Sequence, residues 1–135
     1  ARLAIEAPQK VSGLILVSSL ASPQYLTTKW YFQFVKYIVQ SIQTRSRLKV
    51  FFDEIAPLKN ELEEMQPLWK GIKAKVVVIH GADDTSVSVD NADFITEQLS
   101  THPNFVKSIL RQTGHQVLKK QPDEIMKAIE LLIQD

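Results

Sequence analysis

The sequence lacks cysteine, contains only four glycines, and carries almost no net charge. Without cysteine, these 135 residues can form no disulfide, thiolate metal site or cysteine nucleophile, which fits a reducing compartment and predicts a cytoplasmic protein. Sixteen Lys and Arg against fifteen Asp and Glu leave a formal charge of +1, which argues against a nucleic-acid partner. No apolar run approaches the roughly 18 residues of a membrane-spanning helix, so no membrane span is expected.

Ligand motifs for common cofactors are also missing. The four glycines are isolated, so no glycine-rich phosphate loop is present. The three histidines show no close ligand spacing, and the Asp83-Asp84 pair has no neighbouring ligand residues. We therefore expect neither a metal ion nor another cofactor.

The remaining composition is that of an ordinary globular chain, with 44% hydrophobic and 23% charged residues. The length suits one domain with one core. The first residues, beginning at Ala1, have a helical pattern without an initiating Met or a capping residue. We therefore expect the sequence to begin inside a larger protein.

Apolar patterning predicts alternating strands and helices. Short apolar runs at 11–17, 72–81 and 105–110 are typical of buried strands. Helical spacing predicts helices at 1–7, 89–99 and 122–134, with these residues facing the core: Leu3, Ala4, Ala7, Ile125, Ile129, Leu132 and Ile133. This alternation predicts an α/β fold with a parallel sheet flanked by helices.

A long helical insertion separates the first two predicted strands. Residues 26–66 are rich in aromatic side chains at helical spacing. Pro57 is expected to break or kink the second helical segment of this region, at about 48–65. The insertion is too long for a simple connection, so we expect a subdomain over one edge of the sheet.

Candidate chemistry follows the strand ends, because ligand sites of open parallel sheets form beyond the carboxyl ends of the strands. An acid and a histidine after adjacent strands are the orienting pair that a nucleophile-activating triad needs. The residues at these positions are Ser18, Ser19, His80, Asp83, Asp84, Gly114 and His115.

These residues carry a resemblance to the α/β-hydrolases. The segment 76–88 resembles the family's apolar strand and acid loop, of the form H-G-x-x-D-x-x-V-P, and Thr113-Gly114-His115 is similar to its histidine loop. Residues 1–18 are similar to the end of the helix after the nucleophile elbow and the next strand. The chain thus resembles the C-terminal half of a family member.

The resemblance implies a domain organisation and two catalytic residues. Residues 1–20 and 70–135 would form the hydrolase core, and 21–69 the helical cap. Asp84, three residues after Gly81, would orient His115, which would carry the proton. Asp83 is the alternative acid, and Ser88 replaces the family's usual proline. A turn or helix N-cap is the non-catalytic interpretation of Asp84.

Other polar residues receive structural or binding roles. His80 is expected to be packed and hydrogen-bonded, and His102 to be exposed in a turn. Ser18 and Ser19 do not lie in a G-x-S-x-G elbow and are expected to line the pocket wall. The predicted substrate-binding residues are Phe34, Tyr37 and Ser19.

The implied activity is carboxylic-ester hydrolysis of a small apolar substrate by a Ser-His-Asp triad. The nucleophile would lie about seven residues before Ala1, so this chain alone is expected to be inactive. Alternatives are an epoxide hydrolase, a dehalogenase, a carbon–carbon bond hydrolase, or a non-catalytic hydrolase-like binding protein. An exposed sheet edge or the cap could support homo-oligomers.

Overall fold

A computed structural model of the protein describes residues 1–26 and 57–134. Its sheet contains three strands, β1 (Gly13–Val17), β2 (Lys75–Gly81) and β3 (Phe105–Leu110). They lie in the order β1-β2-β3, and both neighbouring pairs are parallel. The predicted α/β class with a parallel sheet is therefore confirmed.

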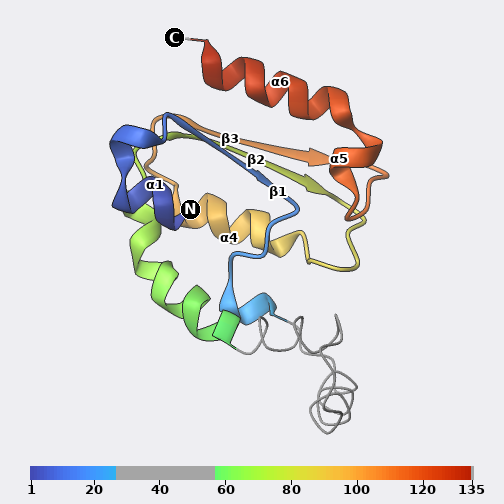
Figure 1. The fold of residues 1–135 in the computed structure, drawn as a ribbon. Coiled ribbons are helices and arrows are strands. Elements are labelled where there is room, and N and C mark those ends of the chain that lie inside the picture. The colour runs from blue at the N-terminus through green and yellow to red at the C-terminus, as the bar shows by residue number, and fades with distance from the viewer. Residues whose placement is uncertain (27–56, 135) are drawn as a thin grey trace, which may run out of the picture.

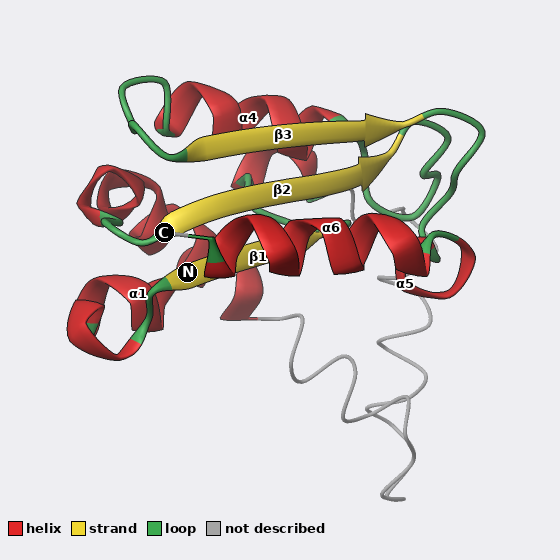
Figure 2. Ribbon diagram, turned by 90° about the horizontal axis from the view of Figure 1, so that it is seen from above, coloured by secondary structure: helices red, strands yellow, loops and turns green. Residues whose placement is uncertain are grey.

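Helices cover both faces of this sheet. Figure 1 shows α6 (Pro122–Ile133) on one face and α1 (Arg2–Glu6) with α4 (Asp90–Gln98) on the other. In the view from above, α6 runs along the strands (Figure 2), and it packs on β1 and β2. Among the described residues, no helix combines the length and apolar character needed to cross a membrane.

The core has two layers because β2 is buried on both faces. Val76 and Val78 pack on the α4 side, whereas Val77 and Ile79 pack on the α6 side. Successive side chains of a strand point to opposite faces, so a central strand between two helical layers needs apolar residues at consecutive positions. This requirement explains the continuous apolar run that predicted the strand.

Element boundaries differ from the sequence prediction where short helices intervene. The predicted strand at 72–81 begins only at Lys75, because the 3₁₀ helix η3 (Gln66–Gly71) ends just before Ile72. The first strand begins at Gly13 rather than at residue 11, after a 3₁₀ helix η1 (Pro8–Lys10). Other short elements were not predicted: α5 (Val117–Lys120) and the 3₁₀ helix η2 (Pro23–Tyr25).

Three apolar residues expected to face the core are exposed. Leu3 is 63% exposed, and in α1 it is Ala4 that is buried. In α6 the packed residues are Ile125, Ala128 and Leu132, while Ile129 and Ile133 are exposed. The buried stripe of α6 is narrow because a helix lying on a sheet contacts it along one line of i, i+3, i+7 positions.

Residues 27–56 lie outside the described part of the chain, and most of the predicted insertion falls there. The described end of this region, residues 57–65, is helical, and Leu62 and Met65 are buried. Pro57 is the first described residue of that helix.

A buried asparagine ties the chain that leaves β1 to α4. The Asn91 Oδ1 accepts hydrogen bonds from the backbone N–H groups of Ala21 and Ser22, each at 3.0 Å. Its Nδ2 donates to the carbonyl oxygen of Ser88, also at 3.0 Å. Asn91 is completely buried, so each of these groups depends on it rather than on water.

We predict that Asn91→Leu lowers the free energy of unfolding by at least about 2 kcal/mol, because buried backbone groups lose their partners. Urea unfolding measures the change. The control Asn104→Leu makes the same exchange at an exposed position and should change stability by less than about 0.5 kcal/mol. Equal effects of the two substitutions would contradict the anchoring role of Asn91.

Candidate active site

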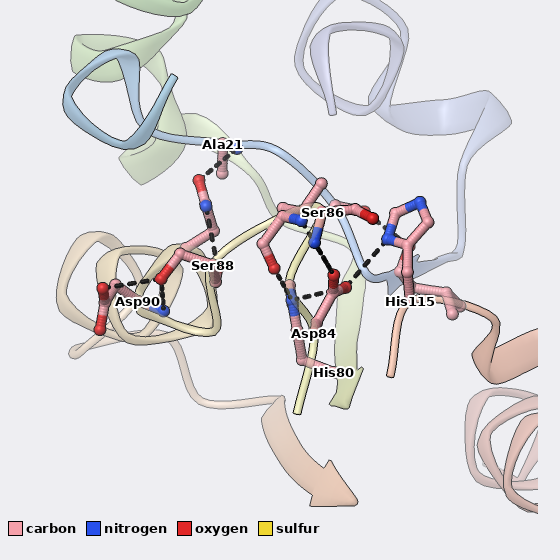
Figure 3. Close-up of polar contacts among 11 residues, drawn as sticks. Ala21, His80, Asp84, Ser86, Ser88, Asp90 and His115 are labelled. Atoms are coloured by element: carbon pink, nitrogen blue, oxygen red, sulfur yellow. Dashed lines mark hydrogen bonds and ion pairs between the residues drawn. The ribbon is translucent and has the colours of Figure 1, made fainter. Parts of the chain in front are cut away.

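The carboxyl ends of β2 and β3 bring an acid and a histidine together. Asp84 lies in the loop after β2, and His115 lies in the loop between β3 and α5. The His115 Nδ1 is 2.9 Å from the Asp84 Oδ2, although the residues are 31 positions apart (Figure 3). The separation is therefore that of a hydrogen-bonded carboxylate–imidazole pair.

The Asp84 carboxylate also organises its own loop. Its side chain is fully buried. Its Oδ1 accepts hydrogen bonds from the backbone N–H groups of Ser86 and Val87, each at 2.9 Å (Figure 3). Such hydrogen bonds are typical of an aspartate that stabilises a turn. The same side chain therefore both stabilises the turn and contacts His115.

The second ring nitrogen of His115 points away from Asp84 (Figure 3). A carboxylate oxygen only accepts, so Nδ1 carries the proton and Nε2 of the neutral ring has a free lone pair. The side chain is 47% exposed and lines a groove with a cavity volume of about 330 Å³. The other lining residues are Val17, Ser18, Gln116, Leu118 and Lys119. A base positioned in this way could accept a proton from a group that enters the groove.

Asp83 is the exposed neighbour of Asp84 and does not take part in the pair. Its backbone N–H donates to the carbonyl oxygen of Thr113 at 3.0 Å. The preceding residue, Ala82, donates to the carbonyl oxygen of Leu110 at 2.9 Å. Backbone hydrogen bonds therefore join the acid loop directly to the histidine loop.

Gly81 allows these two loops to approach. A Cβ atom at this position would overlap the carbonyl oxygen of Thr113 and lie 2.6 Å from that of Gly114. The space beside Gly81 is thus filled by backbone of the histidine loop, which cannot move aside like a flexible side chain. This packing role of Gly81 was not predicted, because the place of the glycine in the H-G-x-x-D motif does not indicate which backbone lies beside it.

The remaining predicted site residues separate into three groups. Phe34 and Tyr37 lie outside the described residues. The Ser19 Oγ donates to the carbonyl oxygen of Val17, two residues earlier, at 3.4 Å, and its role in substrate binding stays a prediction. Ser18 lines the groove; its φ of 45° is rare for a residue with a side chain, and its buried hydroxyl has no hydrogen-bond partner among the described residues.

The two other histidines are not part of the pair. His80 is buried, as expected, and hydrogen-bonded to the carbonyl oxygen of Val87. His102 is partly exposed, in the loop between α4 and β3, and its Nδ1 accepts from the backbone N–H of Asn104. Within residues 1–26 and 57–134, no group of three or more His, Asp or Glu side chains has an arrangement that could hold a metal ion.

Burial and hydrogen bonding act in opposite directions on Asp84. Burial raises the pKa of its carboxyl group, but the N–H groups of Val87 and Ser86 and the ring of His115 lower it by more, so the pKa is below its ordinary value. The charged carboxylate is therefore the form that the folded site stabilises.

The Gly81 contact yields a prediction with a control in the same site. Gly81→Ala should displace the histidine loop and lower the free energy of unfolding by about 2 kcal/mol or more. Gly114→Ala should be tolerated, because a Cβ there has its nearest neighbour at 3.6 Å, the carbonyl oxygen of Asp83. Urea unfolding compares the two variants, and equal stability of both would refute the contact.

The lowered pKa of Asp84 yields a pH dependence. Because the folded pKa lies below the unfolded value near 3.8, the stabilisation is complete above that value. It is lost as the pH falls through the folded pKa, since the unfolded state binds the proton more readily. Urea unfolding between pH 2.5 and about 7 should show a smaller acid-dependent loss in Asp84→Asn, whereas Asp83→Asn should keep the wild-type profile.

No protein-family model matches the sequence, and the search of curated proteins finds no match. Solved structures do resemble the fold. A hydrolase from Pseudomonas aeruginosa PA01 superposes with a TM-score of 0.64 at 14% identity, over 99% of this chain and 60% of its own. A monoacylglycerol lipase from Paleococcus ferrophilus gives 0.64 at 16% identity, over 97% and 62%.

A thermophilic esterase from Thermogutta terrifontis is also similar, with a TM-score of 0.58 at 15% identity, over 95% of this chain and 57% of its own. The chain thus spans about 60% of the length of the first two of these structures. At such low identity the likeness establishes the fold and not the substrate. The chain therefore has the fold of the α/β-hydrolases.

Proposed function

We propose that this chain is the C-terminal part of an α/β-hydrolase that cleaves carboxylic esters, with Asp84 and His115 as the acid and the base of a catalytic triad. The observation that carries the proposal is the 2.9 Å contact between the Asp84 Oδ2 and the His115 Nδ1. The esterase and the monoacylglycerol lipase among the similar structures support an ester as substrate.

In the proposed mechanism, Asp84 keeps the proton of His115 on Nδ1 and stabilises the imidazolium that forms during the reaction. The Nε2 of His115 accepts the proton of a serine hydroxyl and later delivers it to the leaving alcohol. We place this serine on an elbow upstream of Ala1, where a backbone N–H group would also stabilise the oxyanion. The aspartate orients and compensates charge, and it does not itself take the proton.

The cap remains part of the proposal. Residues 21–69 would cover the site, and Phe34 and Tyr37 would contact an apolar acyl group, together with Ser19 at the end of β1. Within the described residues, the groove beside His115 offers the apolar side chains of Val17 and Leu118. A small apolar ester would match such a surface. Homo-oligomers through the cap or the sheet edge are a further element of the proposal.

Steady-state kinetics of the full-length protein on a short and a long aryl ester test the proposal. Asp84→Asn should lower kcat by about 10⁴-fold and His115→Ala by more, because the histidine is both base and acid; KM should change little, since both residues act in the transition state. The controls are His102→Ala and Asp83→Asn, which change the same residue types outside the pair. Near-wild-type kcat in Asp84→Asn, or loss of activity in a control, would contradict the assignment.

Substitutions in the proposed cap should act differently. Phe34→Ala and Tyr37→Ala should raise KM more for the long ester than for the short one, because each lost apolar contact removes about 1–3 kcal/mol of binding. The same kinetic series measures this effect. An unchanged chain-length preference would place the acyl site elsewhere.

A further inference from the structure

A second imidazole lies against the acid of the pair. His80 is the next-to-last residue of β2, and its side chain is 1% exposed. Its Nε2 is 3.0 Å from the carbonyl oxygen of Val87 and 3.4 Å from the Asp84 Oδ2 (Figure 3). The acid therefore has an imidazole on each side, and only the one from His115 reaches the groove.

The neighbours of this nitrogen determine its protonation. Both the carbonyl oxygen of Val87 and the ionised carboxylate of Asp84 can only accept hydrogen bonds. The Nε2 of His80 must therefore carry a proton, which it donates to Val87, and the positive end of the N–H dipole faces the carboxylate. The same ring with its proton on Nδ1 would place a lone pair against two acceptors.

Val87 links the two residues through both of its backbone groups. Its N–H donates to the Asp84 Oδ1 at 2.9 Å, and its carbonyl oxygen accepts from His80 at 3.0 Å. His80, Val87 and Asp84 thus form a closed ring of contacts. Among the groups around the carboxylate, Ser86, Val87 and His115 belong to loops, whereas His80 belongs to the central strand. His80 is therefore the side chain that links the carboxylate to the sheet, beside the backbone bond from the N–H of Asp84 to the carbonyl oxygen of Gly81 at 3.3 Å.

We propose that His80 is a positioning residue for the Asp84–His115 pair. By donating its Nε2–H to Val87, it holds the acid loop so that the Asp84 Oδ2 faces the Nδ1 of His115. Without this donor, the loop would relax, the contact with His115 would weaken, and the ring of His115 would no longer be restricted to the Nδ1–H form. A benefit of the fixed His115 tautomer for catalysis rests on the proposed function, whereas the positioning of Asp84 by His80 does not.

Two substitutions at His80 separate the donor from the volume of the ring. His80→Gln keeps an N–H group at a similar reach from the backbone, and His80→Leu fills similar space without a donor. His102→Leu removes the partly exposed histidine of the loop before β3 and serves as the matched control. The readout is the side-chain ¹⁵N–¹H correlation spectrum of the histidines, which reports the protonated nitrogen of each neutral ring.

We expect the wild-type protein to show His80 protonated on Nε2 and His115 on Nδ1. His80→Leu should shift His115 to a mixture of both tautomers, while His80→Gln and His102→Leu should retain the wild-type form. In the full-length enzyme, His80→Leu should lower kcat by up to about 100-fold and His80→Gln by far less.

Several results would overturn the proposal. One is protonation of His80 on Nδ1 in the wild-type protein, which needs no variant and so remains decisive if His80→Leu does not fold. Another is an unchanged His115 tautomer in a folded His80→Leu protein, which would make His80 a packing residue only. The expected tautomers in a full-length protein without esterase activity would refute the proposed function and leave the positioning role supported.

Discussion

The structure of the candidate site depends on keeping one ionised carboxylate out of water. Removal of a charge from solvent is costly unless hydrogen-bond donors replace the water. Asp84 meets this requirement with two loop N–H groups on Oδ1 and the imidazole of His115 on Oδ2. The conformation of the acid loop and the position of His115 both follow from that need. The contact that stabilises the buried charge therefore also orients the His115 ring, whose other nitrogen is free in the groove.

Backbone contacts keep this arrangement in place. The acid loop donates two N–H groups to carbonyl oxygens at the end of β3 and in the histidine loop, and the absent side chain of Gly81 leaves room for the latter. Backbone is less adaptable than a long side chain. These contacts therefore fix the distance between the two loops independently of the rotamers of Asp84 and His115. Correct geometry in the pair is thus mainly a property of the sheet ends.

The site is also connected to the chain that leads away from β1. Asn91, at the start of α4, binds the backbone of Ala21 and Ser22 on one side and that of Ser88 on the other. Ser88 follows the acid loop directly. A displacement at the exit from β1 would therefore be transmitted to the segment that carries Asp84, through bonds that are shielded from water.

The sequence by itself determined the α/β class and the parallel sheet, and it predicted that His115 meets an acid at position 83 or 84. Continuous apolar runs identify strands buried on both faces, and polar residues after those strands must gather at one edge of a parallel sheet. The strand at 105–110 was predicted to the residue, because a proline and a polar turn bound it.

Only the tertiary structure decided between Asp83 and Asp84, since neighbouring positions in a turn have the same local propensity and differ in burial alone. It also decided that Ile129 and Ile133 of α6 are exposed, and which backbone groups Gly81, His80 and Asn91 contact. These roles depend on contacts between segments distant in sequence. Periodicity and motif spacing describe one segment at a time, so they do not indicate which backbone atoms of another segment lie beside it.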